Sequence, residues 1–168
     1  MCIRDRLRKY GIKSCFEIGT NMGTGTKIIK NAMGEDSRMY SLDLPTELAH
    51  ISLQHPINEG KGDSVGHRCD LPFVQLRGDS LIFNYEPYRD VEAFYIDGEH
   101  DFEHAFHEAS KAISCNAKLI IFHDSDMPEV MKGIIQAFFY TEGCVLHPSL
   151  HYDVYRVVDT RICYAVRK

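Results

Sequence analysis

The sequence of 168 residues predicts one α/β domain: a doubly wound, mostly parallel sheet with helices on both faces and a C-terminal antiparallel hairpin. Three observations predict this class. Short apolar runs alternate with helix-like segments along most of the chain. These runs end at glycine or acidic residues, which is typical of buried strands that lead into turns. Two further strand-like runs, 152–158 and 161–167, are separated only by Asp159 and Thr160, a spacing typical of a hairpin.

The apolar runs expected to form the parallel strands are each short and bounded by turn residues. They cover residues 14–19, 38–44, 73–80, 91–98 and 117–124. Between the second and third lies segment 45–72, which is long and rich in glycine. Loops of this length often have a function, so we expect this segment to close over a site.

Three segments have the spacing of amphipathic helices. They cover residues 26–33, where Gly34 is a suitable C-cap, 101–113, where Asp101 is a suitable N-cap, and 130–139, which follows Pro128. In the second helix the apolar stripe predicts the buried face; it consists of Phe102, Ala105, Phe106, Ala109 and Ile113. This stripe leaves Glu108 on the face expected to lie in solvent.

Composition excludes several classes of function. The net charge of −5 offers no general attraction for nucleic acid or for an anionic membrane. No apolar run approaches the roughly 18 residues that a membrane span needs. Six cysteines stand at positions 2, 15, 69, 115, 144 and 163 without a Cys-x-x-Cys pair, so we expect reduced thiols and a cytoplasmic protein.

The first six residues, MCIRDR, resemble a translated sequencing-adapter peptide. We therefore expect residues 1–6 to be a non-native extension, the natural N-terminus to be truncated, and the single domain to cover 7–168. An ordinary basic N-terminal helix is the alternative.

A glycine run, FEIGTNMGTG, follows the first predicted strand and precedes the first helix. In open α/β sheets, ligands bind at this place. A phosphate-binding P-loop is excluded because no Gly-Lys pair follows Gly19. The dinucleotide pattern G-x-G-x-x-G fails at its third glycine, where Ile28 stands. The pattern that fits is E-x-G-x-x-x-G, formed by Glu17, Gly19 and Gly23, with Asp43 ending the next strand.

This pattern resembles the first motif of the Rossmann-like (class I) S-adenosylmethionine-dependent methyltransferases. The resemblance implies that the loop binds the cofactor; its candidate residues are Glu17, Gly19, Thr20, Asn21 and Gly23. It also implies that Asp43 binds the two ribose hydroxyls, for which a carboxylate is a suitable acceptor. By the same resemblance, the motif GDS places Asp79 and Ser80 near the adenine.

Acidic and histidine residues follow the fourth and fifth predicted strands, in FYIDGEH and IIFHDSD. Neighbouring parallel strands would bring Asp97, His100, His123 and Asp124 to the edge that holds the glycine run. Buried charges cost several kcal/mol unless they are paired or bound to a metal, so this grouping indicates a functional site.

The grouping is similar to that of small-molecule methyltransferases with a DG-x-H motif after the fourth strand and HD ending the fifth. The resemblance covers about residues 12–126 and implies methyl transfer to an oxygen of a small-molecule acceptor such as a sugar or phenol. It also adds Asp97 to the cofactor-binding residues. Nucleic-acid amino-methyltransferases carry an Asp/Asn-Pro-Pro-aromatic motif after strand four, which this chain lacks, so no nucleic-acid substrate is expected.

Two mechanisms stay open at this stage. By the resemblance, Asp97, His123 and Asp124 would hold Mg²⁺, or another divalent ion that accepts imidazole. Without a metal, His100 or His123 would be the general base, and Asp97 would assist it. Two other functions also remain: a cofactor-binding module without catalysis, and a metal-dependent hydrolase or hydroxylase that uses the Asp/His cluster. A homodimer through the edge of the hairpin is a further expectation.

Overall fold

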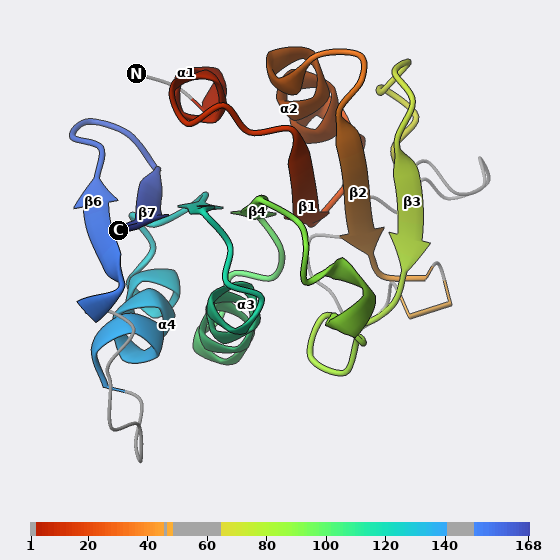
Figure 1. Ribbon diagram of the computed structural model, residues 1–168. Coiled ribbons are helices and arrows are strands. Elements are labelled where there is room, and N and C mark those ends of the chain that lie inside the picture. Colours follow the sequence, from red (N-terminus) through yellow and green to blue (C-terminus); the bar gives the residue numbers. More distant parts are fainter. Residues whose placement is uncertain (1–2, 46, 49–64, 141–149) are drawn as a thin grey trace.

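A computed structural model describes residues 3–45, 47–48, 65–140 and 150–168. Within these residues, seven strands form one sheet in the order β3-β2-β1-β4-β5-β7-β6 (Figure 1). The strands are β1 (Ser14–Ile18), β2 (Arg38–Asp43), β3 (Val74–Arg77), β4 (Ala93–Ile96), β5 (Leu119–Phe122), β6 (Tyr152–Arg156) and β7 (Cys163–Arg167). Strands β1 to β5 are parallel, and β7 runs antiparallel to both β5 and β6. The predicted sheet and its terminal hairpin are confirmed.

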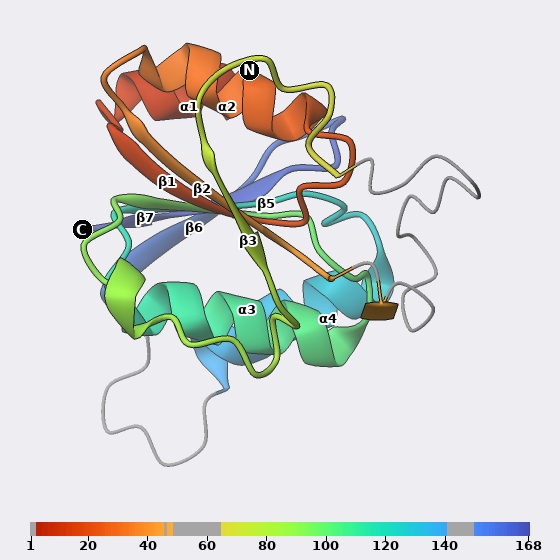
Figure 2. The ribbon, with the colours of Figure 1, turned by 90° about the vertical axis from the view of Figure 1, so that its right-hand side faces the viewer.

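Helices cover both faces of the sheet, as Figure 2 shows. On one face lie α1 (Ile3–Lys9) and α2 (Thr24–Met33), and on the other lie α3 (Phe102–Ser114) and α4 (Pro128–Phe139). A short 3-10 helix, η2 (Glu86–Tyr88), precedes β4. The doubly wound α/β class is therefore confirmed.

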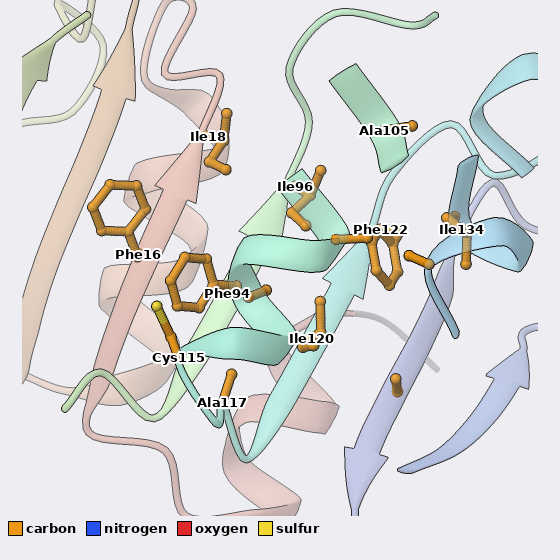
Figure 3. Packing of buried hydrophobic residues seen from close by; sticks show 14 of the residues in the cluster. Phe16, Ile18, Phe94, Ile96, Ala105, Cys115, Ala117, Ile120, Phe122 and Ile134 are labelled. Atoms are coloured by element: carbon orange, nitrogen blue, oxygen red, sulfur yellow. The ribbon is translucent and has the colours of Figure 1, made fainter. Parts of the chain in front are cut away.

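Apolar residues pack on both faces of the sheet. In Figure 3, Phe16 of β1 and Phe94 of β4 lie side by side toward α3, and their rings stack with centroids 5.3 Å apart. Phe122 of β5 lies on the same face and contacts Phe138 of α4 edge-on. Beneath α1 and α2, a second cluster includes Cys15 and Ile29. Burial on both faces explains why the central strands are almost entirely apolar in sequence.

The buried face of α3 matches the predicted stripe in part: Ala105 and Ala109 are buried, and Phe106 and Ile113 pack against the core. The buried residues of α3 are Ala105, Glu108, Ala109 and Ala112, whereas Phe102 is 39% exposed. Small residues occupy this face because α3 lies very close to α4: a Cβ on Gly133 would come within 2.7 Å of the Phe106 backbone nitrogen. The expectation that Glu108 lies in solvent is wrong.

The strands are also shorter than the apolar runs at their carboxyl ends. β3 ends at Arg77, β4 at Ile96 and β5 at Phe122, and the residues that follow leave the sheet as turns. Asp79, Asp97 and Asp124 therefore stand on turns at one edge. The strand order reverses between β1 and β4, which is where open α/β sheets form a ligand crevice.

Other expectations have mixed outcomes. Cys15, Cys69, Cys115 and Cys163 carry free thiols, while Cys2 and Cys144 lie outside the described residues. Most of the expected loop 45–72 also lies outside them, so its closure over a site stays a prediction. α1 continues across the expected boundary at residue 7, and the Arg6 guanidinium lies 4.0 Å from the centre of the Tyr164 ring. No described helix has the length and apolarity that a membrane crossing requires.

Candidate active site

The glycine run forms the turn between β1 and α2, and its first two glycines, Gly19 and Gly23, approach protein backbone. Gly19 has φ +94°, and a Cβ there would lie 2.0 Å from the Asp97 carbonyl oxygen. Gly23 has φ +86°, and a Cβ there would lie 2.8 Å from the Gly66 carbonyl oxygen. Only glycine tolerates both the left-handed backbone and this proximity. The run thus brings the ends of β1 and β4 together.

Asp43 ends β2 beside this turn, and two backbone donors orient its carboxylate. The Asn21 N–H donates to Oδ2 at 2.6 Å, and the Leu44 N–H donates to Oδ1 at 2.8 Å. Asn21 reaches this position because it adopts a left-handed φ of +48°. The Asp43 side chain is only partly buried. Since each carboxylate oxygen accepts more than one hydrogen bond, Asp43 retains the capacity to bind hydroxyl groups.

Glu17 and Thr20 lie beneath the turn and not on its surface. Glu17 is fully buried and accepts hydrogen bonds from Thr26 Oγ1, at 2.5 Å, and from Ser41 Oγ. Burial raises the pKa of Glu17 to about 8, so it holds a proton at neutral pH. Thr20 Oγ1 lies 2.7 Å from Ser41 Oγ. These contacts connect β1, β2 and α2, which gives Glu17 and Thr20 a role in positioning the turn.

The turn after β3 divides its two predicted residues between surface and interior. Asp79 is partly exposed, and its Oδ1 accepts the Leu81 N–H at 2.9 Å. Ser80 is buried, and its hydroxyl donates to Glu108 Oε1 at 2.7 Å. The Tyr85 hydroxyl donates to the Ser80 carbonyl at 3.1 Å. Because the Ser80 hydroxyl is bound to Glu108, Ser80 can contact a ligand directly only with its backbone. Any effect of the hydroxyl on a ligand would pass through Glu108.

The four predicted acids and histidines after β4 and β5 do come together. His100 Nε2 lies 2.8 Å from Asp124 Oδ2 and 4.0 Å from Asp97 Oδ1. His123 Nδ1 lies 3.2 Å from Asp97 Oδ1 and 3.0 Å from Asp124 Oδ2. The Tyr95 hydroxyl donates to Asp97 Oδ2 at 3.0 Å. Asp124 is buried and has a left-handed φ of +50°, which is uncommon outside glycine and often marks a functional site.

Charge is largely balanced within this cluster. The neighbouring Asp97 and Asp124 carboxylates raise the pKa of His123 to about 9, so His123 is an imidazolium at neutral pH. Arg161, from the turn between β6 and β7, forms an ion pair with Asp124 Oδ1. A protonated His123 cannot accept a proton, which leaves His100 as the candidate base in the metal-free protein.

The cluster also contains a set of atoms suited to a metal. One ligand atom each of Asp97, His100 and Asp124 lies within 4.8 Å of the others. This set contains His100, whereas the sequence suggested His123; His123 Nδ1 also lies within 3.2 Å of both carboxylates, and its role as a metal ligand stays a prediction. Two carboxylates and one imidazole fit Mn²⁺, Fe²⁺ or Zn²⁺ as well as Mg²⁺. The cations of His123 and Arg161 already offset the two carboxylates, so an ion would have to compete with them.

Two residues of the site were not found from the sequence. Glu108 lines a small pocket at the ends of β4 and β5, together with Asp97, Gly98, His100, Phe122 and His123. Arg161 lies 37 residues after Asp124 on a hairpin turn, without a local motif. The one available signal for Glu108 was its position among Ala105, Ala109 and Ala112, three small residues at helical spacing around it.

Comparison with known proteins places the fold. No family model matches the chain, and no curated protein matches its sequence. An O-methyltransferase from Bacillus cereus, solved with SAH, superposes with TM-score 0.63 at 16% identity over 98% of this chain and 78% of that one. The O-methyltransferase TomG from Streptomyces achromogenes, involved in tomaymycin synthesis and solved with SAM, gives TM-score 0.59 at 14% identity, over 98% and 77%.

A putative rRNA-methylase from Clostridium thermocellum gives TM-score 0.57 at 12% identity, over 98% of this chain and 95% of that one. Structural similarity at identities this low shows a shared fold only. The chemistry has to be argued from the residues of the site. The chain has the Rossmann-like fold of the class I S-adenosylmethionine-dependent methyltransferases.

Proposed function

We propose that this protein transfers a methyl group from S-adenosylmethionine to an oxygen of a small-molecule acceptor. One observation carries the proposal: the Gly19–Asn21 turn contacts both sides of the proposed reaction site. At one end, the Asn21 N–H binds the Asp43 carboxylate; at the other, Gly19 lies against the backbone of Asp97. A diol-binding acid and a proton-handling cluster at the two ends of one turn suit a cofactor that spans them.

The residues at the first end fit the cofactor. Asp43 is held by two backbone donors and is accessible, as a carboxylate that receives a vicinal diol must be. The same charge would repel the 2′-phosphate of NADP. Asp79, on the neighbouring turn, is the candidate for the adenine. S-adenosylmethionine supplies an electrophilic methyl group on its sulfonium when bound.

The residues at the other end handle the acceptor. Asp124 orients the His100 imidazole, which is the proposed base for the acceptor hydroxyl. His123, as an imidazolium between two carboxylates, holds Asp97 and Asp124 in place. If a divalent ion is used, Asp97, His100 and Asp124 would hold it, and it would lower the pKa of the hydroxyl and orient it. Alignment of acceptor and methyl group is the main contribution of the protein.

The acceptor, the compartment and the assembly state belong to the same proposal. A net charge of −5 and acids at the site disfavour nucleic acid, and support a small molecule. Free thiols at the described cysteines favour the cytoplasm.

The exposed outer side of β6, where Tyr155 is 45% exposed, suits a homodimer contact. Sedimentation analysis of wild type and Tyr155→Asp tests that contact, because an introduced charge at the edge should yield monomers.

Calorimetric titration with S-adenosylhomocysteine tests the cofactor assignment. We expect binding in the micromolar range, and Asp43→Ala should weaken it by about tenfold or more because the diol loses its acceptor. Asp90→Ala is the matched control, since Asp90 pairs with Arg38 at the other end of β2. Equal affinities of the wild type and Asp43→Ala would remove Asp43 from the site.

Turnover on a panel of hydroxyl compounds then separates the alternatives. Binding without any methylated product favours a cofactor-binding module. Activity that disappears with a chelator but needs no S-adenosylmethionine favours a hydrolase or hydroxylase built on the Asp97, His100 and Asp124 set.

A further inference from the structure

Glu108 is a buried acid that the proposed chemistry does not use. It lies on α3 with 1% of its surface exposed, and it lines the small pocket at the ends of β4 and β5. Its Oε1 accepts a hydrogen bond, whereas its Oε2 is buried without a partner among the described residues. An unsatisfied buried oxygen is costly, so its retention calls for a reason.

The Glu108 carboxyl contacts the turn that is proposed to bind the cofactor. Ser80 Oγ donates to Oε1 at 2.7 Å, and the same turn is held from its other side by the Tyr85 hydroxyl, which donates to the Ser80 carbonyl. Ser80 directly follows Asp79, the candidate for the adenine. The position of Asp79 thus depends on a hydrogen bond to α3.

The same carboxyl also contacts the turn that carries the acceptor cluster. A Cβ on Gly98 would lie 2.8 Å from Glu108 Oε1 and 3.3 Å from Oε2, so the carboxyl lies directly against the Gly98 backbone. Gly98 stands between Asp97 and His100. One side chain therefore packs against both ligand-facing turns.

We propose that Glu108 is a positioning residue that sets the cofactor-binding turn at Ser80 relative to the acceptor-binding turn at Gly98. This inference rests on the proposed function, because the two turns matter together only if both ligands bind. Glu108 touches neither reacting group and acts through Ser80 and the Gly98 backbone.

The protonation state of Glu108 makes this role measurable. Burial raises its pKa to about 8, and nearby acids add to the effect. The titratable groups on the elements around it are Asp79 and Tyr85 before β4, Asp97, Glu99 and His100 after β4, Asp101 at the start of α3, and His123 after β5. Above pH 8, a carboxylate forms against the Gly98 backbone and among these acids, and it should move the two turns apart.

The experiment measures affinity for S-adenosylhomocysteine at pH 7 and pH 9 in wild type, Glu108→Gln and Glu108→Ala. At pH 7 we expect Glu108→Gln to bind within about threefold of wild type and Glu108→Ala to bind about tenfold more weakly. Between pH 7 and pH 9, wild type should lose about fivefold more affinity than Glu108→Gln, because Gln cannot ionise while Glu17 and His123 titrate in both proteins and cancel in the comparison. Glu129→Gln, at an exposed site on α4, controls for removal of an acid.

Each outcome bears on the inference. If Glu108→Ala does not fold, the pH comparison between wild type and Glu108→Gln decides alone. An equal loss of affinity at pH 9 in both, with both still folded by circular dichroism, overturns the positioning role. If wild type binds no S-adenosylhomocysteine at all, the proposed function fails and this inference with it, whereas binding that Glu108→Ala leaves unchanged overturns only the inference.

Discussion

Two buried carboxyl groups lie under the candidate site, on opposite faces of the sheet: Glu17 of β1 is hydrogen-bonded to Thr26 of α2, and Glu108 belongs to α3 on the other face. Each accepts hydroxyl hydrogen bonds through one oxygen, while the other oxygen has no partner among the described residues. Burial raises the pKa of both to about 8. Both residues thus enter the folded state as neutral acids at physiological pH, which avoids the cost of a buried charge.

This state predicts how stability depends on pH. The folded pKa of Glu17 lies above that of the unfolded chain, so the folded protein binds more protons between about pH 4.5 and pH 8. Its free energy of unfolding should therefore fall as the pH rises through this window, by about 4 kcal/mol for this one group. Glu17→Gln should lose clearly less between pH 5 and pH 8. Urea unfolding at the two pH values measures this, and a loss equal to that of wild type would contradict it.

Gly19 gives a second prediction at the residue scale. Gly11 and Gly19 both have positive φ, but a Cβ on Gly11 would meet nothing within 4 Å, whereas one on Gly19 would overlap the Asp97 carbonyl. Gly11→Ala should cost about 1 kcal/mol for the left-handed backbone alone. Gly19→Ala should cost at least about 3 kcal/mol, because the ends of β1 and β4 must also separate. Similar unfolding free energies for the two variants would show that this contact is not tight.

Among the elements, the hairpin of β6 and β7 has a role beyond closing the sheet. Its turn carries Arg161, whose guanidinium pairs with Asp124 after β5 and whose Nε lies 3.3 Å from Asp126 Oδ1. The Ser125 N–H also donates to the Arg161 carbonyl at 3.0 Å. The hairpin thus holds the left-handed backbone of Asp124 from outside the parallel sheet.

Removal of this arginine should therefore reduce stability. Arg161→Ala leaves the buried Asp124 carboxylate with only imidazole neighbours, and we expect a measurable loss of stability, limited because Arg161 is half exposed and screened by solvent. Arg161→Lys should restore part of it. Arg156→Ala, on the exposed side of β6, is the matched control. Chemical denaturation of the three variants measures the difference. Equal stabilities of Arg161→Ala and Arg156→Ala would show that the histidines alone stabilise the Asp124 carboxylate.

Sequence patterns predicted the positions of the helices and strands better than the buried faces of the helices. The strands and helices lie where hydrophobic spacing placed them, and Gly34 and Asp101 cap their helices as expected. The buried face of α3 was predicted only in part: Phe102 is exposed and Glu108 is buried, because the close contact with α4 at Gly133 turns the small residues of α3 inward. Helix rotation depends on the partner surface, and a single helix does not contain that information.

At the scale of the whole molecule, the candidate metal ligands meet only when β4 and β5 are paired. Asp97 and His100 follow one strand, and Asp124 follows the other. An ion bound there would bind the folded state alone and would stabilise the entire chain by mass action.

If the cluster holds an ion, Mn²⁺ at saturating concentration should raise the unfolding midpoint by about 5 °C or more, and a chelator should reverse the rise. His100→Ala should abolish the shift. His104→Ala should keep it, because His104 pairs with Asp101 outside the cluster. Differential scanning calorimetry with and without Mn²⁺ measures it. An unchanged midpoint in wild type would favour the metal-free mechanism, with His100 as the base.

By itself, the sequence determined the fold class, the edge of the sheet that carries the site, and the identity of most polar groups there. These follow from local chemistry: hydrophobic period, glycine positions and acids at strand ends, each read within a few residues. Only the tertiary structure decided that Glu108 faces inward, that His100 lies with Asp97 and Asp124 in a metal-like set, and that Arg161 reaches Asp124. Those contacts depend on strand pairing and helix rotation, which are set by packing between segments far apart in the chain.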